Sequence, residues 1–544
     1  MTGWTQHLPV LPVLLPAATA IVLLGLGDQR DGAGRLCAAR RIALASAALA
    51  LLIALQLAAV ADTDALTVYR LGDWPAPYGI VLVVDRLAAL MLVLTALVAL
   101  PVLLYASDGW DARGRHFHAL FQFQLMGLNG AFVTGDLFNL FVFFEVLLIA
   151  SYVLMLHGGG AERLRVGLHY VVLNLCASAL FLIGVALVYG LTGTLNLADL
   201  ALRVPRVLGP DAVLLKAAGL LLLVVFGFKA ALAPLSLWLP ATYAAASAPV
   251  AAMFAIMTKV GVYAILRVHG VVFGDFAAAG PAGPGGSAAL LVQPLLLPLA
   301  LAGCVLAGLG ALAAASLPRL VAWLTVASVG TMLAAIGLFG AAAWSAALYY
   351  LANSTLIVAA LFLWAELLAD QRGEAAGRLE PARPVAQPAL LGTLLLLAAV
   401  SAAGLPPLPG FIGKLMLLQA SAGHASAALL WTVVLAVGFM TLLALARAGV
   451  LLFWNVHGDA AAGAAAAPPR RLAATVSLLA ASVAMSVAAA PLLRYSDAAA
   501  RQLTDREAYA RAVLPGLGGP AADSALPYTG LIPATPATPA KVPR

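Results

Sequence analysis

The lysines of this chain lie where a surface protein would not place them. Of 30 basic residues only five are lysines, and four of these, Lys216, Lys229, Lys259 and Lys414, fall within apolar segments. A cation inside a membrane is costly and faces a protein interior or a wet cavity, so it marks a functional site by default. Arginine stays protonated, whereas a buried lysine can release and regain a proton. Lys229, Lys259 and Lys414 are therefore candidates for a proton pathway.

Glu145 is the acid expected at a comparable depth, near the middle of the segment GDLFNLFVFFEVLLIASY. An acid there needs a partner, and a nearby lysine would let it remain ionised. The strength of such a pair changes whenever either member gains or loses a proton, which makes Glu145 and Lys229 a candidate gate. The alternative is a structural ion pair that locks two helices together.

Prolines predict two broken helices beside these lysines. Pro234 follows Lys229 by five residues, and Pro406 and Pro407 stand in GLPPLPG shortly before Lys414. Proline removes a backbone donor and clashes with the preceding turn, so a helix kinks or breaks there. Two interrupted helices in separated parts of the chain indicate an internally repeated transporter with its pathway between the halves.

Other ionisable residues in the apolar segments have simpler interpretations. Lys216 lies about a turn inside the outer end of its expected helix, where a long side chain can reach the lipid headgroups. Several acids and histidines lie near expected helix ends, where water is close, and of these Asp136 is a candidate entrance; they are Asp85, Asp136, Glu366, His169, His269 and His424.

The sequence predicts no metal site and no redox cofactor. Cys37, Cys176 and Cys304 stand alone, without the spacing that holds zinc, haem or an iron–sulfur cluster. No segment carries the nucleophile–base pattern or the phosphate-binding motif of an enzyme. The net charge of +7 is scattered over short loops, which favours membrane topology over nucleic-acid binding.

The elements that must position these residues are membrane helices. A soluble chain carries roughly a quarter charged residues, whereas this one has 10% and is 63% hydrophobic. Each apolar run can cross a hydrocarbon core of roughly 30 Å as a helix that satisfies its own backbone. We expect an all-α polytopic membrane protein of about fourteen transmembrane helices, at 8–26, 41–61, 81–105, 116–134, 137–157, 165–190, 212–236, 249–269, 288–312, 318–339, 343–368, 387–420, 427–454 and 472–494.

Arginines predict the orientation of these helices. They concentrate in alternate loops, at 27–40, 106–115, 158–165, 313–319, 370–386 and 455–471. Because positive charge favours the inside, these loops are expected in the cytoplasm and both termini outside. The first apolar run lacks the basic start of a secretory signal and is interpreted as a retained helix. After the last span we expect a short amphipathic helix, 497–514, and a disordered Pro/Gly/Ala-rich tail.

The order of these residues resembles a known family. Glu145 in its Phe-rich segment, Lys229 before a Pro and Trp-Leu-Pro stretch, Lys259 in TKVGVYAILR and Lys414 after GLPPLPGF resemble the antiporter-like subunits of respiratory complex I and of Mrp-type cation/proton antiporters. The resemblance covers roughly 85–454. The segment TGDLFNLFVFFEVLLIASY is most similar to the D-type subunits of the Mrp antiporters.

The resemblance implies a fold and a division of roles. It implies fourteen helices with two inverted five-helix repeats: N-terminal helices at 1–115, a first repeat at 116–270, a second at 288–454, a last helix at 455–494 and an external tail at 495–544. Glu145 and Lys229 would form the charge pair, Lys259 the central relay, and Lys414 the link to the second half-channel. The implied partners are the other antiporter subunits, protons, monovalent cations and the lipid bilayer of a bacterial inner membrane.

Two rival functions remain at this point. A proton-pumping subunit of an NADH dehydrogenase or a membrane-bound hydrogenase would use the same residues. Several complex I relatives have a histidine two residues after the proline that follows the lysine, whereas this chain has Ser236, which favours the antiporter. The second rival is a polytopic scaffold whose ion pairs only hold helices together.

Overall fold

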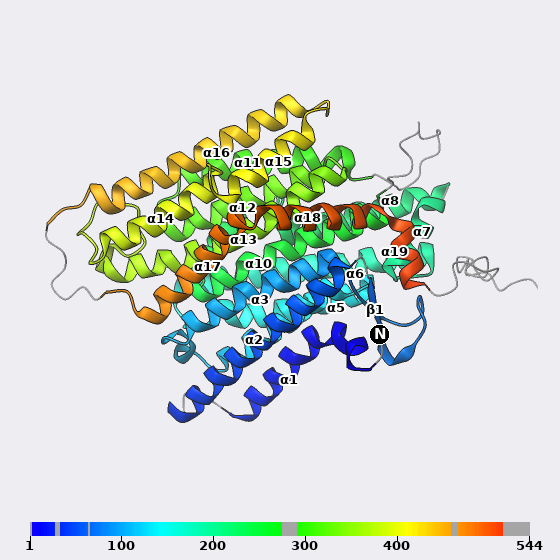
Figure 1. Ribbon diagram of the computed structural model, residues 1–544, viewed down its shortest axis with the longest axis horizontal. Helices are drawn as coiled ribbons and strands as arrows, with labels where there is room; N and C mark the ends of the chain where they lie inside the picture. The colour runs from blue at the N-terminus through cyan, green and yellow to red at the C-terminus, as the bar shows by residue number, and fades with distance from the viewer. Residues whose placement is uncertain are drawn as a thin grey trace, which may run out of the picture.

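The computed structural model describes residues 3–27, 33–63, 66–207, 209–274, 291–458 and 466–514. Within them the chain is a bundle of helices that run along its longest axis (Figure 1). The longer helices are α1 (Leu11–Gly25), α2 (Ala33–Asp62), α3 (Arg86–Ala106), α4 (Phe117–Val133), α5 (Leu137–Met155), α6 (Ala161–Thr192), α8 (Pro210–Ala230), α10 (Ala248–Ala264), α11 (Gln293–Leu312), α12 (Leu317–Ile336), α13 (Ala341–Gln371), α14 (Pro388–Ala403), α15 (Pro409–Ser421), α16 (Ala427–Gly449), α17 (Pro469–Val487) and α18 (Ala489–Thr504).

The all-α membrane fold is confirmed, but the count of fourteen spans is not. Twelve helices in the described residues are long and apolar enough to cross a membrane. The two other expected positions hold α4, which has 17 residues and carries Gln122, Gln124 and Asn129, and the pair α14–α15, which is interrupted. α4 is short and carries polar residues, and α14 and α15 are each short, with 16 and 13 residues. Neither position therefore holds one continuous apolar helix of about 20 residues, the length that crosses a hydrocarbon core.

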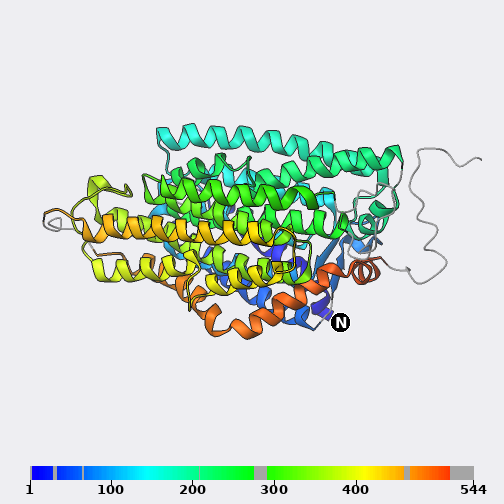
Figure 2. The same ribbon diagram turned by 90° about the horizontal axis from the view of Figure 1, so that it is seen from above.

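Three helices form the centre of the bundle. The most apolar windows of α10, α12 and α13 are 100%, 89% and 89% buried inside the protein, compared with 33% for α2. These central helices have a lower mean hydropathy, 1.6 to 1.8, than the lipid-facing α2, α6 and α16, at 2.3 to 2.6, because their buried faces carry polar residues. Viewed from above, α6 runs along one edge of the bundle, and α17 and α18 run along the opposite edge (Figure 2).

Both predicted helix breaks are present. α8 ends at Ala230, Ala231 adopts the left-handed conformation with φ +62°, and the chain resumes as the short helix α9 (Trp238–Ala245). α14 ends at Ala403 with Gly404 at φ +82°, and α15 begins at Pro409. Pro234 and the Pro406–Pro407 pair lie inside these breaks, as their missing backbone donors require.

Each half of the bundle also ends in an unpredicted π-helix. The segment η6 (Ile265–Val272) continues α10, and η8 (Val450–Trp454) continues α16. Thus the segments 116–270 and 288–454 each contain one broken helix and one helix with a π-helical end. The division of the chain at these boundaries remains a prediction.

Two further elements lie near the end of the bundle that carries the N-terminus. An antiparallel hairpin of β1 (Thr67–Arg70) and β2 (Val81–Val84) was not expected from the sequence. The expected amphipathic helix is present as α18 and α19 (Arg506–Val513), and it packs on the bundle. The described N-terminal and C-terminal ends lie at the same end of the bundle (Figure 1). The tail beyond Leu514 lies outside the described residues.

Candidate functional site

Lys229 is a buried cation at the last turn of α8. Its side chain is buried, with the residue 7% exposed, and Nζ donates a hydrogen bond to Asn174 Oδ1 on α6 at 2.9 Å. The break beyond α8 is fixed locally, because Trp238 Nε1 and the backbone nitrogen of Ala231 both donate to the carbonyl oxygen of Phe228, at 3.1 Å each. A buried ammonium is tolerated where such an acceptor and a rigid surrounding replace part of its hydration.

Glu145 lies on α5 and bonds to the face of α6 that also carries Asn174. Ser178 Oγ donates to Glu145 Oε1 in a short hydrogen bond. In the described part of the chain Glu145 and Lys229 form no direct ion pair, and each bonds to a polar side chain of α6 instead. Their partners, Ser178 and Asn174, lie four residues apart on α6.

Lys259 lies at the middle of the central helix α10 and is 0% exposed. The nearest acceptors of its Nζ are Thr258 Oγ1 at 3.4 Å and Ser328 Oγ on α12 at 3.5 Å, both long for hydrogen bonds. α10 approaches the end of α8 closely: a Cβ at Gly261 would lie 2.4 Å from the backbone nitrogen of Ala230. Gly261 thus brings the helix that carries Lys259 against the break that follows Lys229.

Lys414 lies on α15 and turns back onto the end of α14. Its Nζ donates to the carbonyl oxygen of Ala403 at 2.7 Å and lies 3.5 Å from that of Ala402. The last carbonyls of a helix lack intrahelical partners and carry the negative end of the helix dipole, so a cation is stabilised there. The turn favours glycine because Gly404 has φ +82°, and a Cβ there would also displace the Lys414 side chain, since it would lie 2.6 Å from Cδ.

A cavity of about 30 Å³ with both polar and apolar lining residues lies beside Lys414 and reaches Ser328, whereas Lys259 itself is not among its lining residues. Ser328, which is the α12 contact of Lys259, lines this cavity together with Lys414. A volume of this size holds one or two water molecules where polar groups surround it. The polar part of its lining comes from α12, α13, α14 and α16: Ser328, Thr331, Tyr350, Asn353, Ser354, Ser401 and Thr441.

The other predicted positions have mostly structural surroundings. Asp136 caps α5, with Oδ1 accepting from the backbone nitrogen of Asn139 at 2.8 Å, and burial raises the pKa of its carboxyl above the usual range. Lys216 is partly buried in the second turn of α8. His269 is fully buried, and its Nε2 lies 2.9 Å from the carbonyl oxygen of Gly219, so its role is structural.

Arg267 departs from the concentration of arginines in the loops. Arg267 is buried in η6, which continues α10, and forms a bidentate ion pair with Asp85 at 2.7 and 2.9 Å. Asp85 is 1% exposed rather than close to water. Lys259, Tyr263 and Arg267 are spaced four residues apart and therefore share one face of the helix. The signal was present in the sequence, because Arg267 and Asp85 both fell inside expected spans.

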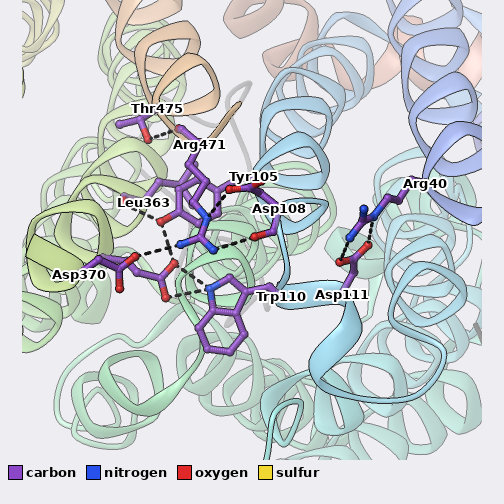
Figure 3. A network of polar contacts seen from close by, with 10 residues as sticks. Arg40, Tyr105, Asp108, Trp110, Asp111, Leu363, Asp370, Arg471 and Thr475 are labelled. Atoms are coloured by element: carbon purple, nitrogen blue, oxygen red, sulfur yellow. Dashed lines mark hydrogen bonds and ion pairs between the residues drawn. The ribbon is translucent and has the colours of Figure 1, made fainter. Parts of the chain in front are cut away.

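A second polar network lies at the end of the bundle opposite the N-terminus. Arg471 on α17 forms ion pairs with Asp108 and Asp370 at 3.1 and 3.0 Å (Figure 3). Glu366, expected near water, is partly buried and accepts hydrogen bonds from Tyr105 and Trp110. These contacts join the ends of α3, α13 and α17 and stabilise the packing of the three helices.

Asp111 forms the neighbouring part of this network outside the membrane spans. Its carboxylate accepts two hydrogen bonds from Arg40, at 2.6 and 2.8 Å, and lies 2.9 Å from His118 Nε2. Burial acts to raise the pKa of Asp111, but the hydrogen bonds from Arg40 and His118 outweigh it and hold the pKa at about 2. Asp111 therefore stays ionised at any physiological pH.

The described residues contain no group of three or more His, Cys, Asp or Glu side chains that could hold a metal ion. Broken membrane helices with buried lysines beside them define a multi-pass membrane protein of the transporter class. Residues 134–443 match the family described as "NADH:quinone oxidoreductase/Mrp antiporter, TM". The chain belongs to this family.

Named relatives extend the similarity over nearly the whole chain. It is 42% identical to the D-type subunit of a probable K⁺/H⁺ antiporter from Rhizobium meliloti (strain 1021), over 92% of this chain and 96% of the relative. It is 34% identical to the D-type subunit of the Na⁺/H⁺ antiporter from Bacillus subtilis (strain 168), over 93% of this chain and 99% of the relative.

Solved structures share the fold. A chain of the Mrp complex from Dietzia sp. DQ12-45-1b superposes with a TM-score of 0.81 at 28% identity, covering 94% of this chain and 100% of that one. A chain of respiratory complex I from Thermus thermophilus superposes with a TM-score of 0.74 at 24% identity, covering 92% and 99%. The second match shows the fold alone.

Proposed function

We propose that this chain is the proton-translocating subunit of a multisubunit Na⁺(K⁺)/H⁺ antiporter in a bacterial inner membrane, with both termini outside. The observation that carries the proposal is the cavity beside Lys414 that Ser328 also lines, while Ser328 Oγ lies 3.5 Å from Lys259 Nζ. The relatives named as D-type antiporter subunits support the same interpretation.

In this mechanism a proton that reaches Lys259 passes through water in the cavity to Lys414. Hydroxyl groups such as Ser328 can donate and accept a hydrogen bond, which suits them to a water-filled relay. The carbonyls of Ala402 and Ala403 stabilise Lys414 when it is charged. Charge moves along the bundle, and no bond to a substrate forms or breaks.

The pair of Glu145 and Lys229 acts as the gate. Lys229 can keep its contact with Asn174 or approach Glu145, and the balance changes when either group gains or loses a proton. Coupling to cation transport requires two states that bind the two ions differently. The metal cation passes at a subunit boundary or through another subunit, and the other antiporter subunits are the partners.

The test is proton uptake by everted membrane vesicles that contain the whole antiporter. Lys259→Ala and Lys414→Ala should each abolish cation-dependent proton movement while membrane abundance is retained. Lys216→Ala is the matched control, because it removes a lysine that is only partly buried, and it should transport normally. Normal antiport in Lys259→Ala or Lys414→Ala would remove that lysine from the pathway.

The second candidate function is a subunit of a redox-driven pump, favoured by the shared fold with complex I. Its discriminating test is the composition of the complex purified from the native membrane. Copurification with other antiporter subunits supports the antiporter, whereas copurification with flavin or iron–sulfur subunits supports the redox-driven pump.

A further inference from the structure

A groove with a volume of about 950 Å³ opens on the side of the bundle. One wall is the first part of α6, the second is the break between α8 and α9, and the third is contributed by the start of α12 at Arg319. This groove is separate from the cavity beside Lys414, with which it shares no lining residue.

The basic residues of the groove lie at one end of it. Arg165 is in the second turn of α6, Arg319 is in the first turn of α12, and both side chains are exposed. His169 lies one turn further along α6, and Glu162 is the one acid among the lining residues. This end of the groove therefore carries two arginine charges and one carboxylate. Its net charge is positive, which favours binding of an anion.

The rest of the groove is apolar and faces outward. Leu168 is 63% exposed, Val172 is 49% exposed and Leu237 is 64% exposed. Leu168 and Val172 follow Arg165 along α6, so the polarity changes from basic to apolar along the direction of the helices. A phospholipid has the same order of groups, with an anionic head followed by apolar chains.

We propose that this groove binds an anionic phospholipid, with its phosphate between Arg165 and Arg319 and an acyl chain along Leu168, Val172 and Leu237. Basic pockets between membrane helices on the cytoplasmic side bind anionic headgroups in this way. Arginine suits phosphate, because its planar guanidinium can donate two parallel hydrogen bonds.

The occupied groove touches the first helix break. Phe228, Pro234 and Trp238 form part of its wall, and Lys229 follows Phe228 directly. A bound lipid therefore packs against the segment that joins α8 to α9 and restricts its movement. The binding site itself does not depend on the proposed transport function.

The test uses the purified complex in phosphatidylcholine nanodiscs, with phosphatidylglycerol as the titrated probe and retained lipid counted by native mass spectrometry. Arg165→Gln/Arg319→Gln should weaken phosphatidylglycerol retention by about 25-fold, because each of the two arginines contributes about fivefold to the attraction of an anionic headgroup. Arg41→Gln/Arg470→Gln is the matched control, since it removes two exposed arginines near the starts of α2 and α17. This control should retain phosphatidylglycerol like the parent.

Two results would overturn the proposal. Equal loss of phosphatidylglycerol from both double variants would mean that the arginines attract the lipid through the general positive charge of the surface and not through a site in the groove. A photo-crosslinker placed at Leu168 should label phospholipid, and labelling of another subunit would assign the groove to a protein interface instead. Inorganic phosphate at the same concentration should not displace the lipid, because it cannot fill the apolar wall.

Discussion

Asn174 and Ser178 lie one turn apart on α6, and each bonds to one charged residue of the proposed gate. Asn174 accepts a hydrogen bond from Lys229 at 2.9 Å, and Ser178 donates to Glu145. Because both hydrogen bonds come from one helix face, a change at one charged group can be transmitted to the other through α6. The proposed gate therefore comprises four residues on three helices.

Two substitutions of Asn174 should affect two different quantities, the membrane abundance and the transport rate. Asn174→Leu removes the acceptor of Lys229 and should lower membrane abundance, because an unsatisfied buried polar group costs about 1–3 kcal/mol. Asn174→Asp adds a carboxylate beside Lys229 and should keep abundance but slow transport, because it fixes the lysine in an ion pair. Vesicle proton uptake and immunoblotting measure the two effects. Transport at the parental rate in both variants would exclude Asn174 from the gate.

Gly404 should be required for the position of Lys414. Its φ of +82° favours glycine, and a Cβ there would lie 2.6 Å from Lys414 Cδ. Gly404→Ala should cost about 1–2 kcal/mol in backbone strain and reduce transport by more than the accompanying loss of abundance. Gly423→Ala is the control, since no atom lies within 4 Å of a Cβ at that position. Equal transport per molecule in the two variants would contradict the prediction.

The sequence predicted the lysines and the breaks because each has a local signal. A lysine in an apolar run and a proline inside a helix are visible without knowing the fold. Asn174 and Ser178 were not predicted, because a single polar residue on a membrane helix is common and its partner is known only when α5, α6 and α8 are packed together. The Asp85–Arg267 pair was missed because its members are 182 residues apart.

The number of spans was less predictable than their positions. α4 carries amides that lower its hydropathy, yet its Asn129 donates to the carbonyl oxygen of Pro12 in a buried contact. Sequence alone shows the polar residue but not the partner that makes its burial tolerable. The π-helical ends of α10 and α16 have no sequence signal that we can identify.

Ser328 should control the step between Lys259 and Lys414. Ser328→Val removes the hydroxyl that contacts Lys259 and fills part of a cavity of about 30 Å³, so water should be excluded and proton uptake should fall at least tenfold. Thr325→Val is the control, because Thr325 lies on the same helix outside the cavity and the exchange preserves its shape. Equal rates in the two variants would mean that protons bypass the cavity.

The loop 107–116 should dock less firmly in acid because of His157. Its Nε2 bonds to the carbonyl oxygen of Trp110 at 2.8 Å, and burial, with a smaller effect of Arg163, lowers the pKa of His157 below its usual 6.5. The undocked state therefore binds the proton more readily, so docking is complete above pH 6.5 and weakens below it. Protection factors of the loop, which correct the hydrogen-exchange rates for the intrinsic pH dependence of amide exchange, should fall on acidification to about pH 5.5, and His157→Gln should remove most of this fall. An unchanged pH dependence in His157→Gln would assign it to another group.

The final prediction concerns the coupling between Glu145 and Lys229 across α6. Glu145→Gln leaves a buried lysine without its acid, and Lys229→Gln leaves the acid without its lysine, so each single variant should lose abundance. The double variant should recover abundance relative to the worse single variant, because no unpaired charge remains. Since Glu145 and Lys229 each bond to a side chain of α6 and not to each other, we expect a coupling free energy of about 1 kcal/mol, less than the roughly 3–5 kcal/mol lost when a direct buried pair is broken.

Transport distinguishes this gate from a structural pair. The double variant should assemble but not move protons, because neither glutamine can titrate. Membrane abundance and vesicle proton uptake of the parent, both single variants and the double variant form a complete double-mutant cycle. Additive losses of abundance would show that the two residues do not interact. Robust transport by the double variant would show that Glu145 and Lys229 hold the helices together without gating the proton.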